Sequence, residues 1–155
     1  MSLQNDVMFL RQLDLFQAFD DDQIKLVAFN AGKRSFPKGK TLFRQGDKAS
    51  GALIVTDGTV ALERHGADGT IEEGEVGPGT ILGELALVCD VERHLGAVAQ
   101  SDTTAIEIPR MVFRRLLDEY PDIAVAMHEK LATRLASATT DLAALGTRFS
   151  AAANM

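Results

Sequence analysis

The sequence predicts a mainly β fold of the α+β class: an antiparallel β jelly-roll, or double-stranded β-helix barrel, with helices at its N-terminal and C-terminal ends. Two observations predict this fold. Between residues 33 and 108, about eight short apolar segments with strand-like alternation are separated by turns that contain glycine or proline. The segments before and after this region carry apolar residues at helical spacing instead.

The N-terminal helices are expected between about residues 6 and 31. An apolar stripe at helical spacing predicts one helix, or two short helices, over residues 6–19. The acidic triplet Asp20-Asp21-Asp22 then supplies an N-cap and the negative first turn that the helix dipole favours. We expect the second helix to end at Gly32.

The strands of the barrel, about 33–108, follow in order along the chain. Strand-like residues flank a turn at 35–40, and the further strands are expected at 41–44, 52–55, 59–63, 70–76, 95–99 and 103–108. The dipeptide Asp57-Gly58 separates two of these strands and predicts that they form a hairpin. A turn at 77–79 leads into the irregular segment 79–93, which we call the cassette.

The C-terminal helices are expected over about residues 109–145. Pro109 suits the first position of a helix that Tyr120-Pro121 interrupts. A longer helix from Asp122 ends near Gly146, and 146–155 is expected to be a loose tail. The apolar seam of the helix from Asp122 consists of Ala124, Met127, Leu131, Leu135, Ala138, Leu142 and Leu145. We expect this seam to pack against the barrel, against a second subunit in a homodimer, or against both.

Composition limits the class of protein. A chain of 155 residues suits one domain, 1–155, with a sizeable core. The net charge of −6 argues against direct binding of nucleic acid, because binding to phosphate backbones is largely electrostatic. No apolar run is long enough to span a membrane, the first six residues lack the basic and apolar regions of a signal peptide, and Cys89 has no second cysteine to pair with. These features predict a cytoplasmic protein.

A metal-dependent enzyme on a similar small barrel is the rival from another class. Such an enzyme needs a His-x-His pair with a glutamate and a further histidine, whereas His65, His94 and His128 are widely separated in this sequence. Cys89 has no visible base beside it and is interpreted as a packing residue. We therefore expect no catalytic residues, no metal ligands and no cofactor.

The cassette has the residues of an anion and sugar site. Gly83 precedes a short helical turn, where main-chain N–H groups favour a negative charge. Glu84 is suited to accept hydrogen bonds from two sugar hydroxyls, or alternatively to cap its own turn, and Arg93 offers a two-pronged donor to a phosphate. One phosphate and one diol are the polar groups of a cyclic nucleotide. The other interpretation of Arg93 is a solvated loop residue paired with Glu92 or Asp90.

The sequence Gly83-Glu84-Leu85-Ala86-Leu87, followed at the expected spacing by Arg93, resembles the phosphate-binding cassette of the cyclic nucleotide-binding domain family. The resemblance covers roughly residues 12–145. The family includes the sensor domains of catabolite-activator-type regulators. It implies a ligand site formed by Gly83, Glu84, Leu85, Ala86, Arg93 and His94, with cAMP as the favoured ligand and cGMP as the other. This chain departs from the family pattern at Glu92, where proline is usual, and at His94, Leu95 and Gly96.

Two functions remain open at this point. In the favoured one, the protein is a regulatory sensor that binds a cyclic nucleotide and signals through its C-terminal helices to a separate effector protein, because no DNA-binding domain is expected after Leu145. The alternative is a structural or adaptor protein of the same fold with a pocket that no longer binds the nucleotide. A carboxylate at Glu92, which competes with a phosphate for Arg93, would favour the alternative.

Overall fold

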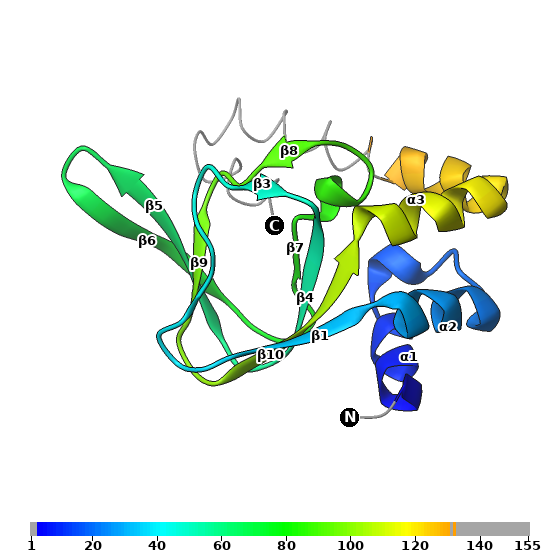
Figure 1. The fold of residues 1–155 in the computed structure, drawn as a ribbon, viewed down its shortest axis with the longest axis horizontal. Coiled ribbons are helices and arrows are strands. Elements are labelled where there is room, and N and C mark those ends of the chain that lie inside the picture. The colour runs from blue at the N-terminus through cyan, green and yellow to red at the C-terminus, as the bar shows by residue number, and fades with distance from the viewer. Residues whose placement is uncertain (1–2, 131, 133–155) are drawn as a thin grey trace.

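The computed structural model describes residues 3–130 and 132. Helices lie at the N-terminal and C-terminal sides of a set of antiparallel strands, and Figure 1 shows the three α-helices gathered on one side of the sheets. In chain order, the elements are α1 (Leu3–Arg11), the 3₁₀ turn η1 (Asp14–Phe16), α2 (Asp21–Asn30), β1 (Gly32–Phe36), β2 (Thr41–Phe43), β3 (Lys48–Ala49), β4 (Gly51–Asp57), β5 (Val60–Gly66), β6 (Gly69–Val76), β7 (Ile81–Leu82), the 3₁₀ turn η2 (Glu84–Leu87), β8 (Val91–Glu92), β9 (Gly96–Ala99), β10 (Thr103–Pro109) and α3 (Arg110–Glu119).

The strands form two four-stranded sheets and one short two-stranded sheet. The orders are β1-β10-β4-β7, β2-β9-β5-β6 and β3-β8, and every pairing is antiparallel. The prediction of an antiparallel β fold with flanking helices is therefore confirmed. Within residues 3–130, however, backbone hydrogen bonds do not close the sheets into one continuous barrel.

Two hydrophobic cores lie on opposite faces of β4. Alternate residues of this strand point to opposite sides, as they must in any β-strand. Ala52 and Ile54 pack into the core that the sheet shares with the helices, while Leu53 and Val55 pack into the core between the sheets. This two-sided burial explains why residues 51–55 of the strand are apolar and not alternately polar.

The N-terminal segment follows the prediction closely. The helical stripe over 6–19 forms α1 and η1, two short elements, and α2 begins after Asp20. The Asp20 carboxylate accepts a hydrogen bond from the backbone N–H of Gln23 at 2.8 Å. The side-chain oxygen of Gln23 accepts one from the backbone N–H of Asp20, also at 2.8 Å. This reciprocal capping box satisfies amides that the first turn of a helix would otherwise leave unpaired.

The predicted hairpin around Asp57-Gly58 is wrong. β4 pairs with β10 and β7, whereas β5 pairs with β6 and β9, so the chain crosses from one sheet to the other at this turn. Residues 64–66 and 69, which lie between the strands expected at 59–63 and 70–76, belong to β5 and β6 and lengthen their hairpin, which projects away from the helices (Figure 1). The local turn signal was correct, but pairing partners are chosen by burial of the strand faces.

One correction concerns the C-terminal side. Pro109 is the last residue of β10 and the N-cap of α3, with an extended backbone, and helix begins one residue later. Residues 121–130 are helical, and Met127 of the predicted seam is buried in the core that the sheet shares with the helices. The remaining seam residues Leu131, Leu135, Ala138, Leu142 and Leu145, and the tail from Gly146, lie outside the described residues.

Candidate functional site

The cassette turns into η2 at Gly83. This residue has φ +86° and ψ +41°, a left-handed conformation that side chains rarely adopt, and it precedes η2. A Cβ atom added to Gly83 would lie 2.1 Å from Nη1 of Arg93. Glycine is therefore favoured at this position by the backbone conformation, and any side chain here would displace the tip of Arg93.

Arg93 is held in place by its own main chain. It lies between β8 and β9, where its N–H donates to the Asp47 carbonyl at 2.7 Å and its carbonyl accepts from the Gly46 N–H at 2.7 Å. The turn before β3 thus clamps the backbone of Arg93 on both sides. The side chain is fixed in direction as a result, because its Cα cannot shift without breaking two short hydrogen bonds.

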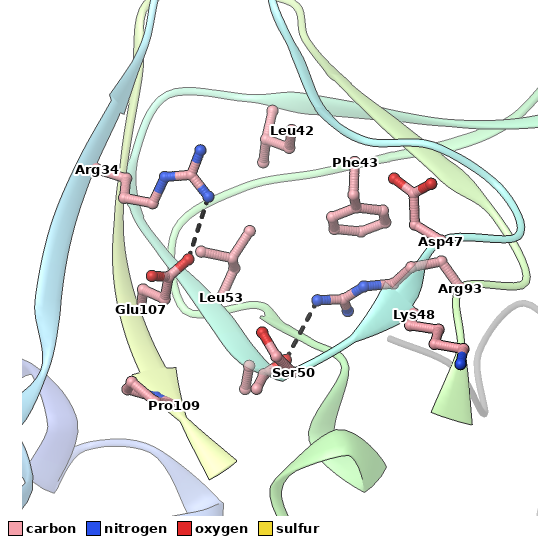
Figure 2. Close-up of a pocket in the computed structure, with 12 residues that line it drawn as sticks. Arg34, Leu42, Phe43, Asp47, Lys48, Ser50, Leu53, Arg93, Glu107 and Pro109 are labelled. Carbon is pink, nitrogen blue, oxygen red and sulfur yellow. Dashed lines mark hydrogen bonds and ion pairs between the residues drawn. The ribbon is translucent and has the colours of Figure 1, made fainter. Parts of the chain in front are cut away.

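The Arg93 guanidinium lies over the ring of Phe43, 4.0 Å from its centroid (Figure 2). Nη2 donates to the Gly51 carbonyl at 3.2 Å, while Nη1 is buried without a hydrogen-bond partner among the described residues. Burial lowers the pKa of Arg93 from its ordinary value, and the negative charges of Asp47 and Glu107 oppose this. An arginine stays protonated under such conditions, so the site holds a partly desolvated cation with a free N–H donor.

A cavity of about 200 Å³ opens beside this guanidinium. Its far wall carries the ion pair between Arg34 of β1 and Glu107 of β10, whose Nη1 and Oε2 atoms are 3.1 Å apart (Figure 2). The other lining residues are Leu42, Phe43, Asp47, Lys48, Ser50, Gly51, Ala52, Leu53, Arg93 and Pro109. The mixture of cations, carboxylates and one aromatic ring suits a ligand that is anionic at one end and carries polar and flat groups elsewhere.

The sequence analysis missed Arg34, Phe43, Asp47 and Glu107. The signal that could have found two of them is strand alternation: Glu107 lies on the same face of β10 as the inward-facing Ala105, and Arg34 stacks over Phe36 at 4.8 Å. Charged residues at positions that should face the core indicate either an error in the strand assignment or a pocket. Here they line a pocket.

The six residues predicted for the site are not equivalent in the structure. Arg93 lines the cavity and Gly83 adjoins it, whereas Glu84 and Ala86 are buried in η2 behind Gly83. The Ala86 N–H already donates to the Gly83 carbonyl at 2.9 Å. Leu85 is half-buried against the core that the sheet shares with the helices, and His94 is exposed beside Arg93.

The residues that differ from the family pattern also have definite positions. Glu92 is exposed in β8, opposite Lys48, and the carboxylates that act on the Arg93 guanidinium are Asp47 and Glu107. Leu95 is buried in the core between the sheets. The bulk of Leu95 is therefore accommodated by packing between the sheets.

The described part of the chain also bears on two other properties, metal binding and a membrane span. No three His, Cys, Asp or Glu side chains within it are grouped to hold a metal ion; His65 is in β5, His94 follows β8 and His128 is in the helical segment 121–130. Within the same residues, the helices are too short or too polar to cross a membrane.

Comparison with known proteins agrees with this geometry. The family described as "Cyclic nucleotide-binding domain" matches residues 33–120. The cyclic AMP receptor protein of Thermus thermophilus is 32% identical over 131 residues, which cover 83% of this chain and 60% of that protein. The cAMP-dependent protein kinase regulatory subunit of Eremothecium gossypii is 35% identical over 106 residues, which cover 66% of this chain and 22% of that protein. The chain thus spans less than two thirds of the length of either relative.

Among solved structures, the cyclic nucleotide-binding-like protein from Brucella abortus superposes with a TM-score of 0.69 and 40% sequence identity, covering 74% of this chain and 98% of that chain. The family match, residues 33–120, contains every residue that lines the cavity, together with the cassette and α3. On the evidence of the family match, the fold and the position of Arg93, this chain belongs to the cyclic nucleotide-binding domain family.

Proposed function

We propose that the protein is a regulatory sensor that binds a cyclic nucleotide, with cAMP as the favoured ligand, in the cavity between Arg93 and the Arg34–Glu107 pair. The ligand phosphate meets Arg93 and the turn that follows Gly83. Glu84 accepts a hydrogen bond from the ribose, and Leu85, Ala86 and His94 complete the surroundings. The relatives named above are a cyclic AMP receptor and a cAMP-dependent regulatory subunit, which favours cAMP over cGMP.

The observation that carries this proposal is the unpartnered Nη1 of Arg93. A buried donor on a cation is unfavourable unless something accepts its hydrogen bond. A phosphate oxygen satisfies this N–H and neutralises the charge at once, and such charge-assisted bonds are about twice as strong as neutral ones. The left-handed turn at Gly83 brings the main chain before η2 against this guanidinium.

Calorimetric titration with cAMP and with cGMP tests the proposal directly. We expect saturable binding of one nucleotide per chain, with cAMP the tighter ligand. Bound ligand must also stabilise the folded protein, by about 2.7 kcal/mol at a free concentration one hundred times the Kd. Absence of both heat and thermal stabilisation at millimolar concentrations of either nucleotide would favour the adaptor function with an inactive pocket.

Glu84 provides a sharper test of how the ligand lies. If its carboxylate accepts the ribose 2′-hydroxyl, 2′-deoxy-cAMP should bind wild type about tenfold more weakly than cAMP, because a hydrogen bond to a charged group contributes about 1.5–3 kcal/mol. In Glu84→Gln this difference should shrink to about twofold or less. A difference between the two ligands that is unchanged in Glu84→Gln would show that Glu84 serves the turn alone.

The output of the sensor is proposed to be the C-terminal helical region, which would act on a separate effector protein and also contact a second subunit. In support, the segment 121–130 already packs through Ile123 and Met127 on the core that includes Leu87 of the cassette. Sedimentation of wild type and of Leu131→Glu/Leu135→Glu, with and without cAMP, tests the dimer. A wild type that stays monomeric at high concentration would remove that part of the proposal.

A further inference from the structure

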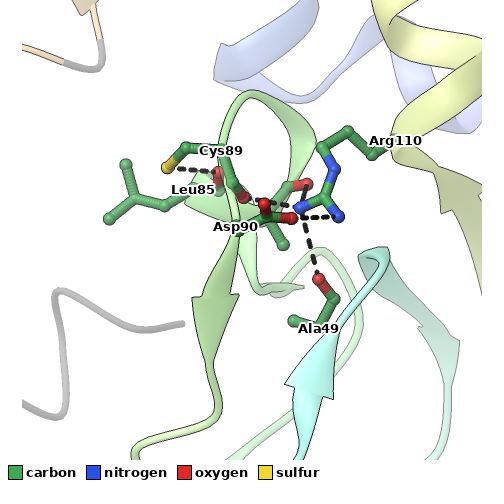
Figure 3. A network of polar contacts seen from close by, with 6 residues as sticks. Ala49, Leu85, Cys89, Asp90 and Arg110 are labelled. Atoms are coloured by element: carbon green, nitrogen blue, oxygen red, sulfur yellow. Dashed lines mark hydrogen bonds and ion pairs between the residues drawn. The ribbon is translucent and has the colours of Figure 1, made fainter.

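Arg110, the first residue of α3, makes a set of contacts that the ligand site does not use (Figure 3). Its Nη1 donates to the Cys89 carbonyl at 2.7 Å and approaches the carbonyls of Ala49 and Ala86 at 3.4 and 3.5 Å. Its Nη2 lies 2.7 Å from an Asp90 carboxylate oxygen. One side chain therefore joins the end of the cassette to β3 and to the start of a helix.

The main chain of Arg110 adds a second connection. Its N–H donates to the Ser50 carbonyl at 2.8 Å, next to Gly51, whose carbonyl accepts from Arg93. Gly51 is packed so closely on β10 that an added Cβ would lie 2.1 Å from the Ile108 carbonyl oxygen. A path of contacts thus runs from Arg93 to Gly51 by a hydrogen bond, along the main chain to Ser50, from Ser50 to Arg110 by a second hydrogen bond, and from the Arg110 side chain to the cassette.

We propose that Arg110 is a positioning residue that fixes the C-terminal end of the cassette, residues 86–90, to the first turn of α3. This goes beyond the proposed function, because it assigns a role to a residue outside the cavity and does not require the ligand. When a ligand takes Arg93 away from the Gly51 carbonyl, the same contacts carry the change to α3. Energetic coupling of this kind needs contiguous contacts of the sort described here.

The contacts of Arg110 differ in weight. The Asp90 side chain is 97% exposed while that of Arg110 is 19% exposed, so water screens their ion pair and its contribution is small. The carbonyl of Cys89 is at a short hydrogen-bond distance, and the other two carbonyls are at the limit where hydrogen bonds become weak. Arg110 should therefore act mainly through main-chain carbonyls, above all that of Cys89.

Amide hydrogen exchange of the ligand-free protein tests the proposal. In Arg110→Met, exchange of residues 84–92 should accelerate about tenfold, as expected for loss of a charge-assisted hydrogen bond. In Asp90→Asn, which removes the ion pair alone, the acceleration should stay below about threefold. Arg115→Met, at an exposed position of the same helix, is the matched control and should leave these residues unchanged.

Residues 60–76 in the β5–β6 hairpin serve as an internal reference, since they lie away from α3 (Figure 1). If exchange in Arg110→Met accelerates equally in the hairpin and in the cassette, Arg110 only supports global stability. If exchange in the cassette does not change, the proposal is overturned. Addition of cAMP should also change amide exchange in residues 110–119 of the wild type. Arg110→Met should bind cAMP without that change in exchange. Failure of wild type to bind cAMP would count against the proposed function, while the ligand-free comparison would still decide the role of Arg110.

Discussion

Replacement of Arg93 by methionine is expected to weaken cAMP binding about tenfold to a hundredfold, because it removes a charge-assisted contact worth about 1.5–3 kcal/mol. The same change should leave the free energy of unfolding of the ligand-free protein equal or higher. In the absence of ligand, the guanidinium is partly desolvated and its Nη1 has no partner. Removal of this desolvated, unpartnered donor is expected to offset or exceed the loss of the Nη2 hydrogen bond to the Gly51 carbonyl and of the contact with Phe43.

The expected loss of affinity without a loss of stability separates a ligand contact from a structural role. Titration calorimetry gives the affinity, and urea unfolding without ligand gives the stability. Arg93→Lys, which keeps the charge but loses the two-pronged donor, should bind with intermediate affinity. Arg44→Met removes an exposed arginine from the turn before β3 and should change neither quantity. If Arg93→Met lowers stability and affinity by similar amounts, Arg93 is a structural residue and the phosphate contact is wrong.

The sequence predicted the parts of the site that are local. Gly83 and the short turn after it lie in one continuous segment, so their geometry depends mostly on neighbouring residues. Arg93 follows ten residues later in the same segment, although its backbone is held by Gly46 and Asp47 from elsewhere in the chain. Nothing beyond that segment has to be known to expect an anion site there. The same is true of the capping box at Asp20 and Gln23, which spans a single helical turn.

The opposite wall could not be predicted in this way, because it depends on strand pairing. Gly32 is paired with Glu107 and Arg34 with Ala105, so Arg34 and Glu107 are diagonal neighbours on adjacent strands that are far apart in the sequence. The two-residue strands β3 and β8 are too short for an alternation signal, yet their pairing fixes the turn that clamps Arg93. The mistaken hairpin at Asp57-Gly58 has the same origin, since turn residues do not determine which strand becomes the partner.

Replacement of Phe113 by alanine is expected to have the largest effect on stability, a loss of about 3–5 kcal/mol in the free energy of unfolding. Phe113 is fully buried in α3, with the ring of Phe19 6.1 Å away between centroids, and Phe19 in turn makes an edge-to-face contact with Phe16 at 5.1 Å. Removing the ring leaves a cavity among aromatic groups from separate elements. Domains of this size have a total stability of about 5–15 kcal/mol, so the change is a large fraction of it.

Urea unfolding of Phe113→Ala measures this loss, and Phe29→Ala is the matched control, because Phe29 is also helical but 75% exposed and should change stability by about 0.5 kcal/mol or less. The core around Phe113 includes Leu87 of the cassette but no residue of the β5–β6 hairpin. Amide exchange in Phe113→Ala should therefore accelerate in α3 and in η2 more than in residues 60–76. Equal acceleration in all three would mean that the helices and the sheets unfold as one unit, and that the cassette is no more closely tied to α3 than the rest of the protein is.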